Sequence, residues 1–224
     1  MIKKLQALKA KKGFTLVELV VVIAIIGVLA AILVPTMIGV VQDSNITSAN
    51  STAAQIKTQA TTFLTNADTH KNAIRATNNN ACDVLKFTVG TNGWTDAGSA
   101  AVTFGTSNPA KYTVSGGTDK NTDFALFMAD VLRDFKSGYV EIYIKNSAVI
   151  GVVAVPGGQV SDIPGALTTV PTSGTTVWEG TQEINWPGNK AGVGNNNIIV
   201  GTAPAIAHNA NAGGNANAGG NANP

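Results

Sequence analysis

Hydrophobic residues form one long run near the start of the chain. Over residues 14–41 only three of 28 side chains are polar, namely Thr15, Glu18 and Thr36. Residues 19–34 contain no polar side chain. As a helix the run would be about 42 Å long, whereas the hydrocarbon core of a bilayer is about 30 Å thick. The pattern therefore predicts a membrane-spanning helix over residues 14–41.

From Asp43 onward the pattern becomes amphipathic. Apolar positions recur at spacings of three and four, which places them on one face of a helix, and Thr, Gln, Ser and Asn fill the other face. We expect this second helix half to span residues 42–77. The stripe consists of Ile46, Ala49, Ala53, Ile56, Ala60, Phe63 and Ala67, with His70 and Ile74 continuing it.

Residues 78–207 contain short β-like runs and a second helix. The helix is expected over Thr122–Lys136, with Asn121 or Thr122 as its cap and Gly138 as its end. Its predicted apolar stripe is Phe124, Phe127, Val131 and Phe135, with Leu132 beside it. Strands are expected at 84–89, 101–104, 111–114, 175–178 and 197–200.

The clearest β-signal is a hairpin. Residues 139–145 alternate, with Val140, Ile142 and Ile144 on one face, and Asn146-Ser147 then turns the chain into the apolar run 148–155. Because this second strand is apolar on both faces, it should lie centrally in a sheet. Together these patterns predict an α+β fold, in which a long N-terminal helix packs through its second half on an antiparallel β-sheet.

Composition changes again at the C-terminal end. Residues 209–224 are two copies of Asn-Ala-Asn-Ala-Gly-Gly followed by Asn-Ala-Asn-Pro, with no large apolar side chain to offset the entropy of ordering. We expect residues 208–224 to form a disordered tail. The single cysteine, Cys82, excludes an intramolecular disulfide and is expected to be a buried small apolar residue.

The charge distribution indicates orientation. Five lysines and no acidic residue precede Gly13, and a flank of this kind remains in the cytoplasm. Without them, ten basic residues stand against 13 acidic ones, so nothing in the charge favours nucleic-acid binding. Only His70 and His208 are available as imidazole ligands, and they lie far apart in the sequence, so we expect no metal site, no cofactor and no catalytic residues.

Glu18 is the unusual residue of the apolar run. A carboxylate at membrane depth costs at least about 2.5 kcal/mol and generally marks function. The run contains no Lys, Arg or His, so a cation could arise there only as a new amine at Phe14. No small-residue cleavage site follows the run, which argues against an ordinary signal peptide.

The junction Lys12-Gly13-Phe14-Thr15-Leu16-Val17-Glu18-Leu19 resembles the class III leader junction of type IV pilins. The resemblance implies that a membrane prepilin peptidase removes residues 1–13, cutting between Gly13 and Phe14, and N-methylates Phe14. It also implies that Glu18 pairs with the terminal amine of a neighbouring subunit. Gly27 and Pro35 coincide with helix breakers of that family, where the backbone can unwind in the filament.

The resemblance further implies a homopolymeric filament subunit, held as a single-pass membrane protein before assembly and extracellular afterwards. Its implied partners are a pilus assembly ATPase and a membrane platform protein. A pseudopilin of a type II secretion or DNA-uptake machine is an alternative. A minor pilin or adhesin that binds glycans through loops bearing Trp94, Trp178 and Trp186 is another, although Trp residues in such loops more often pin them to the core.

Two acidic patterns have simpler interpretations. Asp119, Asp123 and Asp130 have the spacing of an EF-hand loop, but Phe124 occupies the position where that loop needs Gly, so a helix cap is the better account and a different calcium site the alternative. Glu179 and Glu183 lack a neighbouring base and are expected to be solvated.

Overall fold

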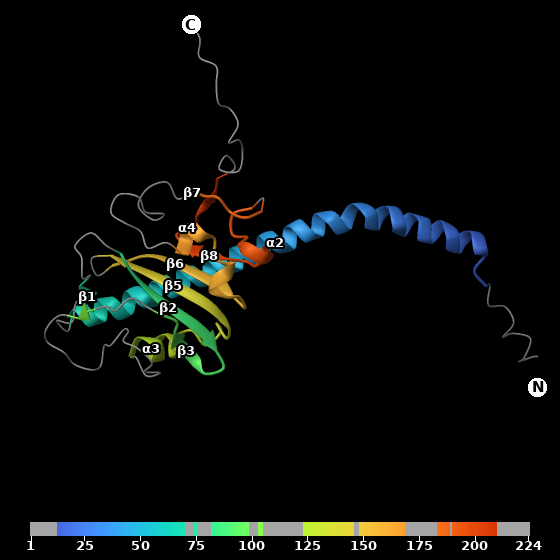
Figure 1. Cartoon of the computed structure of the whole chain (residues 1–224). Helices are drawn as coiled ribbons and strands as arrows, with labels where there is room; N and C mark the ends of the chain where they lie inside the picture. The colour runs from blue at the N-terminus through green and yellow to red at the C-terminus, as the bar shows by residue number, and fades with distance from the viewer. Residues whose placement is uncertain are drawn as a thin grey trace, which may run out of the picture. The chain divides into compact units, whose positions relative to one another are not determined.

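The computed structural model describes residues 13–69, 74–75, 82–98, 103–104, 123–145, 148–168, 183–188 and 190–209. The chain forms two compact units, residues 1–44 and 45–224, and helix α2 contributes to both (Figure 1). The elements in chain order are α2 (Leu16–Thr69), β1 (Ile74–Arg75), β2 (Asp83–Gly90), β3 (Gly93–Asp96), β4 (Thr103–Phe104), α3 (Asp123–Val131), β5 (Gly138–Lys145), β6 (Ala148–Pro156), the 3-10 helix η3 (Val160–Asp162), α4 (Gly165–Thr168), β7 (Glu183–Ile184), the 3-10 helix η4 (Asn195–Asn197), β8 (Gly201–Ala203) and β9 (Ala207–His208).

The second unit is built on an antiparallel five-stranded sheet with strand order β3-β2-β5-β6-β8. The predicted hairpin is confirmed as β5 and β6, and β6 lies inside the sheet between β5 and β8. Gly138 opens β5 at a φ of 142°, and a Cβ at this position would overlap the carbonyl oxygen of Val155 on β6. Two smaller pairs, β1 with β4 and β7 with β9, lie outside this sheet.

One face of the sheet packs against helices. The predicted stripe of α2 is buried there at Ala49, Ala53, Ile56, Ala60 and Phe63. Ala53 and the later residues of the stripe share one core with the inward-facing residues of β2, β5 and β6. Phe124 and Met128 of α3, and Leu132 directly after α3, belong to the same core. The described part of the chain is thus α+β, with a long helix packed on an antiparallel sheet as expected.

The other face of the sheet is covered by the chain after β6. Six apolar residues spaced irregularly along this segment form a second core with Val84, Tyr139, Tyr143, Val153 and Val155. They are Ile163, Leu167, Ile184, Trp186, Val200 and Ile206. The central strand β5 is therefore buried on both faces, except at its last residue.

Several predicted boundaries were wrong. The helix predicted to extend to residue 77 ends at Thr69, and Ile74–Arg75 pairs instead with Thr103–Phe104 as strand β1. The sequence of the last turn contains Asn, Asp and Thr, which are residue types of low helix propensity. His70 and most of the linker that follows lie outside the described residues.

The second helix is shorter than predicted. α3 ends at Val131 rather than residue 136, and Arg133 turns back so that its Nε donates to the Asp130 carbonyl at 3.1 Å. Val131 is 40% exposed, whereas Met128 and Leu132 are buried, so the predicted stripe was wrong at this position. Packing of Leu132 and Phe135 against the core decides where the helix stops.

Near the C-terminal end, the strand predicted at 197–200 was also misplaced. Residues 195–197 form η4, in which Asn196 and Asn197 have positive φ values, and the strand begins at Gly201. The tail predicted from residue 208 was wrong at its first two residues, because His208 belongs to β9 and the Asn209 amide donates to the Ile184 carbonyl. The strands predicted at 111–114 and 175–178, and residues 210–224, lie outside the described residues.

Candidate processing and assembly site

The predicted cleavage junction lies immediately before the first turn of α2. Gly13 and Phe14 are outside the helix, Phe14 is 83% exposed, and no other part of the described chain approaches Gly13 within 4 Å of where a Cβ would lie. The described side of the junction is therefore sterically open in an isolated subunit. Residues 1–12 lie outside the described residues.

Glu18 has a local partner that the sequence analysis missed. The backbone amide of Thr15 donates to Glu18 Oε2 at 2.9 Å, and the Thr15 hydroxyl donates to the same oxygen at 2.7 Å. The Glu18 amide donates back to Thr15 Oγ1 at 3.2 Å. This reciprocal arrangement is a capping box, which satisfies amides at the start of a helix.

The capping box corrects one part of the sequence argument. We expected the Glu18 carboxylate to find use only beside a cation, but within one chain it already stabilises the start of α2. The signal was present, since Thr-x-x-Glu before an apolar run is the sequence pattern of a capping box. Removal of residues 1–13 would leave all four of the bonding groups in place, because they belong to Thr15 and Glu18.

The apolar run has no protein covering in the single chain. Between residues 14 and 41, 19 large apolar side chains are 47–83% exposed, from Val22 at the lower end to Phe14 at the upper. By length and composition, the described part of the chain contains one helix suited to crossing a membrane, and this run is its N-terminal part. Burial of such side chains stabilises by about 1.5–3 kcal/mol each, so the run needs an apolar environment worth tens of kcal/mol.

The two predicted helix breakers lie within α2 without ending it. Pro35 has no amide to donate, which leaves the carbonyl four residues earlier without its helical partner. The next residue, Thr36, donates its hydroxyl to the Leu33 carbonyl at 2.8 Å. No neighbouring side chain lies within 4 Å of a Cβ added at Gly27.

The second unit (residues 45–224, the head) contains a buried carboxyl group. Glu141 on β5 is fully buried, with Tyr139 Oη donating to Oε1 at 3.1 Å and Tyr143 Oη donating to Oε2 at 2.6 Å. Burial raises the pKa of Glu141, an effect opposed by the Tyr143 hydrogen bond, the charge of Lys86 and the Tyr139 hydrogen bond. Burial also raises the pKa of both tyrosines, which keeps their hydroxyl protons available for donation.

The other candidate residues have structural roles where the structure describes them. Trp94 and Trp186 are 4% and 2% exposed, so the packing interpretation is confirmed for both, and Trp178 lies outside the described residues. Cys82 is buried, as expected. The Asp130 carboxylate pairs with Arg133, and the described residues contain no cluster of His, Cys, Asp and Glu that could hold a metal ion.

Comparison with known proteins supports the interpretation of the N-terminal segment. Residues 8–34 match the family model of the prokaryotic N-terminal methylation motif. Two fimbrial proteins of Pseudomonas aeruginosa are each 47% identical over 53 residues, which cover 24% of this chain and 34% of theirs. The type IV narrow pilus major component PilA5 of Thermus thermophilus is 46% identical over 46 residues, 20% of this chain and 40% of that protein.

These matches cover a limited part of each protein. The chain aligns with about a third of the length of the Pseudomonas relatives, and no solved structure matches it significantly. The matched motif lies on the exposed apolar part of α2. This chain therefore carries the prokaryotic N-terminal methylation motif, and its N-terminal segment is similar to those of type IV pilins.

Proposed function

We propose that this protein is the structural subunit of an extracellular type IV pilus filament. The observation that carries the proposal is the exposed apolar surface of residues 14–41, which surrounds the first half of α2 on every side. These side chains need an apolar environment. A bilayer provides it before assembly, and a bundle of the same helices from neighbouring subunits provides it afterwards. The N-terminal methylation motif at the same residues supports the same account.

Processing would proceed at the open junction. The lysine-rich leader holds the N-terminus in the cytoplasm, and a prepilin peptidase cuts between Gly13 and Phe14 and methylates Phe14. The cleaved subunit waits in the membrane until a cytoplasmic ATPase and a membrane platform protein drive its addition to the filament. The role is structural rather than catalytic, and no cofactor enters it.

Glu18 would act both in the membrane-stored subunit and in the assembled filament. In the membrane-stored subunit, its capping box with Thr15 reduces the cost of burying a carboxylate. In the filament, one Glu18 oxygen pairs with the new amine at Phe14 of a neighbouring subunit. A misplaced subunit would leave both charges unpaired in a low dielectric, so this pair sets the register of addition.

Gly27 and Pro35 would allow α2 to adapt when subunits pack. The helix is continuous through both residues in the single chain. Gly costs about 1 kcal/mol and Pro about 3 kcal/mol relative to Ala inside a helix. The backbone between them is therefore the least costly place for α2 to unwind in a filament.

Three substitutions separate the two roles of Glu18. Glu18→Ala removes both the charge and the capping box, and should allow cleavage and membrane insertion but strongly reduce filament yield. Glu18→Gln keeps a capping residue, since Gln can replace Glu in the box, but removes the charge. It should therefore lie between Ala and wild type in filament yield. Thr15→Val removes the capping hydroxyl and keeps the charge, and should retain most assembly.

The assay compares cleaved protein in membranes with filaments sheared from the surface. Loss of one partner of a buried ion pair costs about 3–5 kcal/mol, enough to suppress filaments while cleaved subunit accumulates. Wild-type filament yield from Glu18→Ala alone would refute the ion-pair role. Equal losses for Thr15→Val and Glu18→Ala would assign the effect to capping instead.

A further inference from the structure

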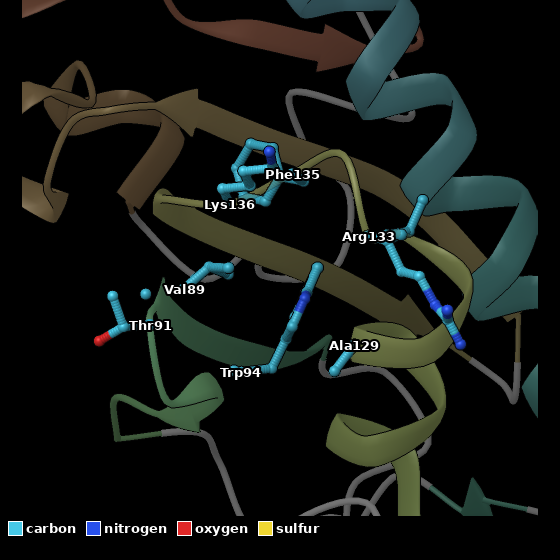
Figure 2. A pocket seen from close by; sticks show the side chains of 10 residues that line it. Val89, Thr91, Trp94, Ala129, Arg133, Phe135 and Lys136 are labelled. Carbon is cyan, nitrogen blue, oxygen red and sulfur yellow. The ribbon is translucent and has the colours of Figure 1, made fainter.

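The pocket of about 380 Å³ between the turn of the β2–β3 hairpin and the end of α3 is a packing feature (Figure 2). Trp94 lines it, but only 4% of this residue is exposed, and Gly90 and Gly93 pair with each other in the ladder. The described residues therefore leave no ring face and no free turn amides for a ligand there. The apolar half of α2, by contrast, contains a polar group that packing within the chain does not explain.

This group is the hydroxyl of Thr36. Thr36 has the only polar side chain in residues 19–41, and it is exposed on α2 directly after Pro35. Its hydroxyl donates to the Leu33 carbonyl at 2.8 Å and lies 3.5 Å from the Ile32 carbonyl. A hydroxyl in an apolar environment is costly unless it is hydrogen-bonded, and these contacts within the helix reduce that cost.

The turn that Thr36 contacts has already lost one backbone hydrogen bond. Pro35 has no amide, so the carbonyl four residues earlier has no helical partner, and the proline ring crowds that carbonyl. α2 nevertheless continues through this turn (Figure 1). In a regular α-helix the Leu33 carbonyl accepts from the Met37 amide. It therefore has two donors within reach, that amide and the Thr36 hydroxyl.

The second donor matters because of the surroundings of this helix half. When a helical turn opens in water, a water molecule can replace the amide as the partner of the freed carbonyl. In hydrocarbon no water is present, and Ser or Thr side chains are among the groups that can satisfy backbone groups freed beside a proline. A Thr hydroxyl that bonds a carbonyl of the preceding turn also favours bending of a helix.

We propose that Thr36 is the hydrogen-bond donor that allows the turn at Pro35 to open inside an apolar environment. When the Met37 amide moves away, the hydroxyl stays on the Leu33 carbonyl, so this carbonyl always has a partner. The proposal rests on the proposed membrane-held subunit, and it assigns a role to a residue outside the matched motif, which ends at residue 34. Because all three groups belong to one chain, the test does not need filaments.

The test measures hydrogen–deuterium exchange of the Met37 amide by NMR, with the full-length protein in detergent micelles. Thr36→Val keeps the shape of the side chain and removes its hydroxyl, so opening of the turn leaves the Leu33 carbonyl unpaired. After correction for the intrinsic rates, the Met37 amide should exchange about tenfold more slowly than in wild type, as expected for one hydrogen bond lost from the open turn. Thr36→Ser keeps the hydroxyl and should exchange like wild type.

Thr62→Val is the matched control in the same helix. The Thr62 hydroxyl donates to the Thr58 carbonyl at 3.0 Å, but this position is exposed outside the apolar run and has no proline beside it. Water can replace the hydroxyl there, so the amide of residue 62, which bonds the same carbonyl, should exchange within about twofold of its wild-type rate.

Unchanged or faster exchange of the Met37 amide in Thr36→Val would overturn the proposal, because the hydroxyl would then be idle or would hold the turn closed. Equal slowing in Thr62→Val would also overturn it, since the effect would then be general to threonine in a helix. Circular dichroism establishes that each variant keeps its helix content. Failure of wild type to form filaments would contradict the proposed function alone, because the exchange rates are measured on single subunits.

Discussion

Replacing the buried carboxyl of Glu141 by an amide should make the head less sensitive to pH. Glu141→Gln keeps the shape of the side chain and its carbonyl oxygen, which can still accept a hydrogen bond from Tyr143 or Tyr139. It removes the only charge that the side chain can carry. The cross-strand neighbours of Glu141 are Lys86 on β2 and Val153 on β6, so the variant also leaves one cation without that acidic neighbour.

The sign of the effect follows from the direction of the pKa shift. The pKa of Glu141 is raised in the folded state, so the native protein binds its proton more tightly than the unfolded chain does. The stabilisation from this proton is complete below the unfolded pKa of about 4.3 and is lost as pH rises through the folded pKa. Between the unfolded pKa and the folded pKa of Glu141, the free energy of unfolding of wild type should fall by up to about 1.4 kcal/mol per pH unit relative to that of Glu141→Gln.

Urea unfolding of the fragment 42–209, followed by circular dichroism from pH 4.5 to 7.5, measures this difference. The free energy of unfolding of Glu141→Gln minus that of wild type should increase with pH and then level off. Glu141→Ala is the contrasting variant, because it removes the carboxyl oxygens that accept from Tyr139 and Tyr143, and the loss of such buried hydrogen bonds should lower stability by about 1–3 kcal/mol at every pH. A difference between Gln and wild type that is constant with pH, or decreases, would refute the reasoning.

Three further outcomes are expected. Gly201→Ala places a methyl group against the Ala49 carbonyl of α2 and should lower the free energy of unfolding by about 1–3 kcal/mol. Its control, Gly90→Ala, places a methyl group where no neighbour lies and should change that free energy by less than about 0.5 kcal/mol. Equal effects of the two substitutions in urea unfolding would contradict the close approach of Gly201 to α2. Fragment 42–209 should sediment as a soluble monomer, because it lacks the exposed apolar side chains of residues 14–41. If this fragment formed filaments, the apolar run could not be what drives assembly. Deletion of residues 210–224 should leave thermal stability and filament yield unchanged, and a large drop in either would show that the tail contributes to the fold.

The sequence predicted the parts of the fold that depend on regular periodicity. The α2 stripe through Ala53, Ile56 and Ala60 and the β5–β6 hairpin were both found as expected. Each of these segments repeats its pattern over enough residues to distinguish a helix from a strand. The boundaries were less predictable, because the end of α3 depends on where Leu132 and Phe135 reach the core.

The second core was not predictable from such patterns. Ile163, Trp186 and Ile206 are single apolar residues in a segment of turns, and only the tertiary fold brings them onto one face of the sheet. The same covering buries Glu141, which strand alternation alone places on the face opposite Val140. Its two tyrosine partners at i−2 and i+2 share that face, which is a signal that could have been read from the sequence.

The candidate site also contains residues that the sequence identified and one residue that it missed. Gly13, Phe14 and Glu18 were identified from the junction motif, and the family match at residues 8–34 supports that choice. Thr15 was missed, although its spacing to Glu18 predicts the capping box that the structure shows. An ion pair with a second subunit is beyond what one chain can display, so it rests on the proposed assembly.

The central claim is that this chain is cleaved after Gly13 and polymerised through the exposed apolar half of α2. Intact-mass and N-terminal fragment spectra of the subunit in sheared surface filaments test it most directly. We predict a filament subunit that begins at Phe14 and carries one methyl group on its terminal amine. A filament subunit that begins at Met1, or after residue 35, would contradict the account.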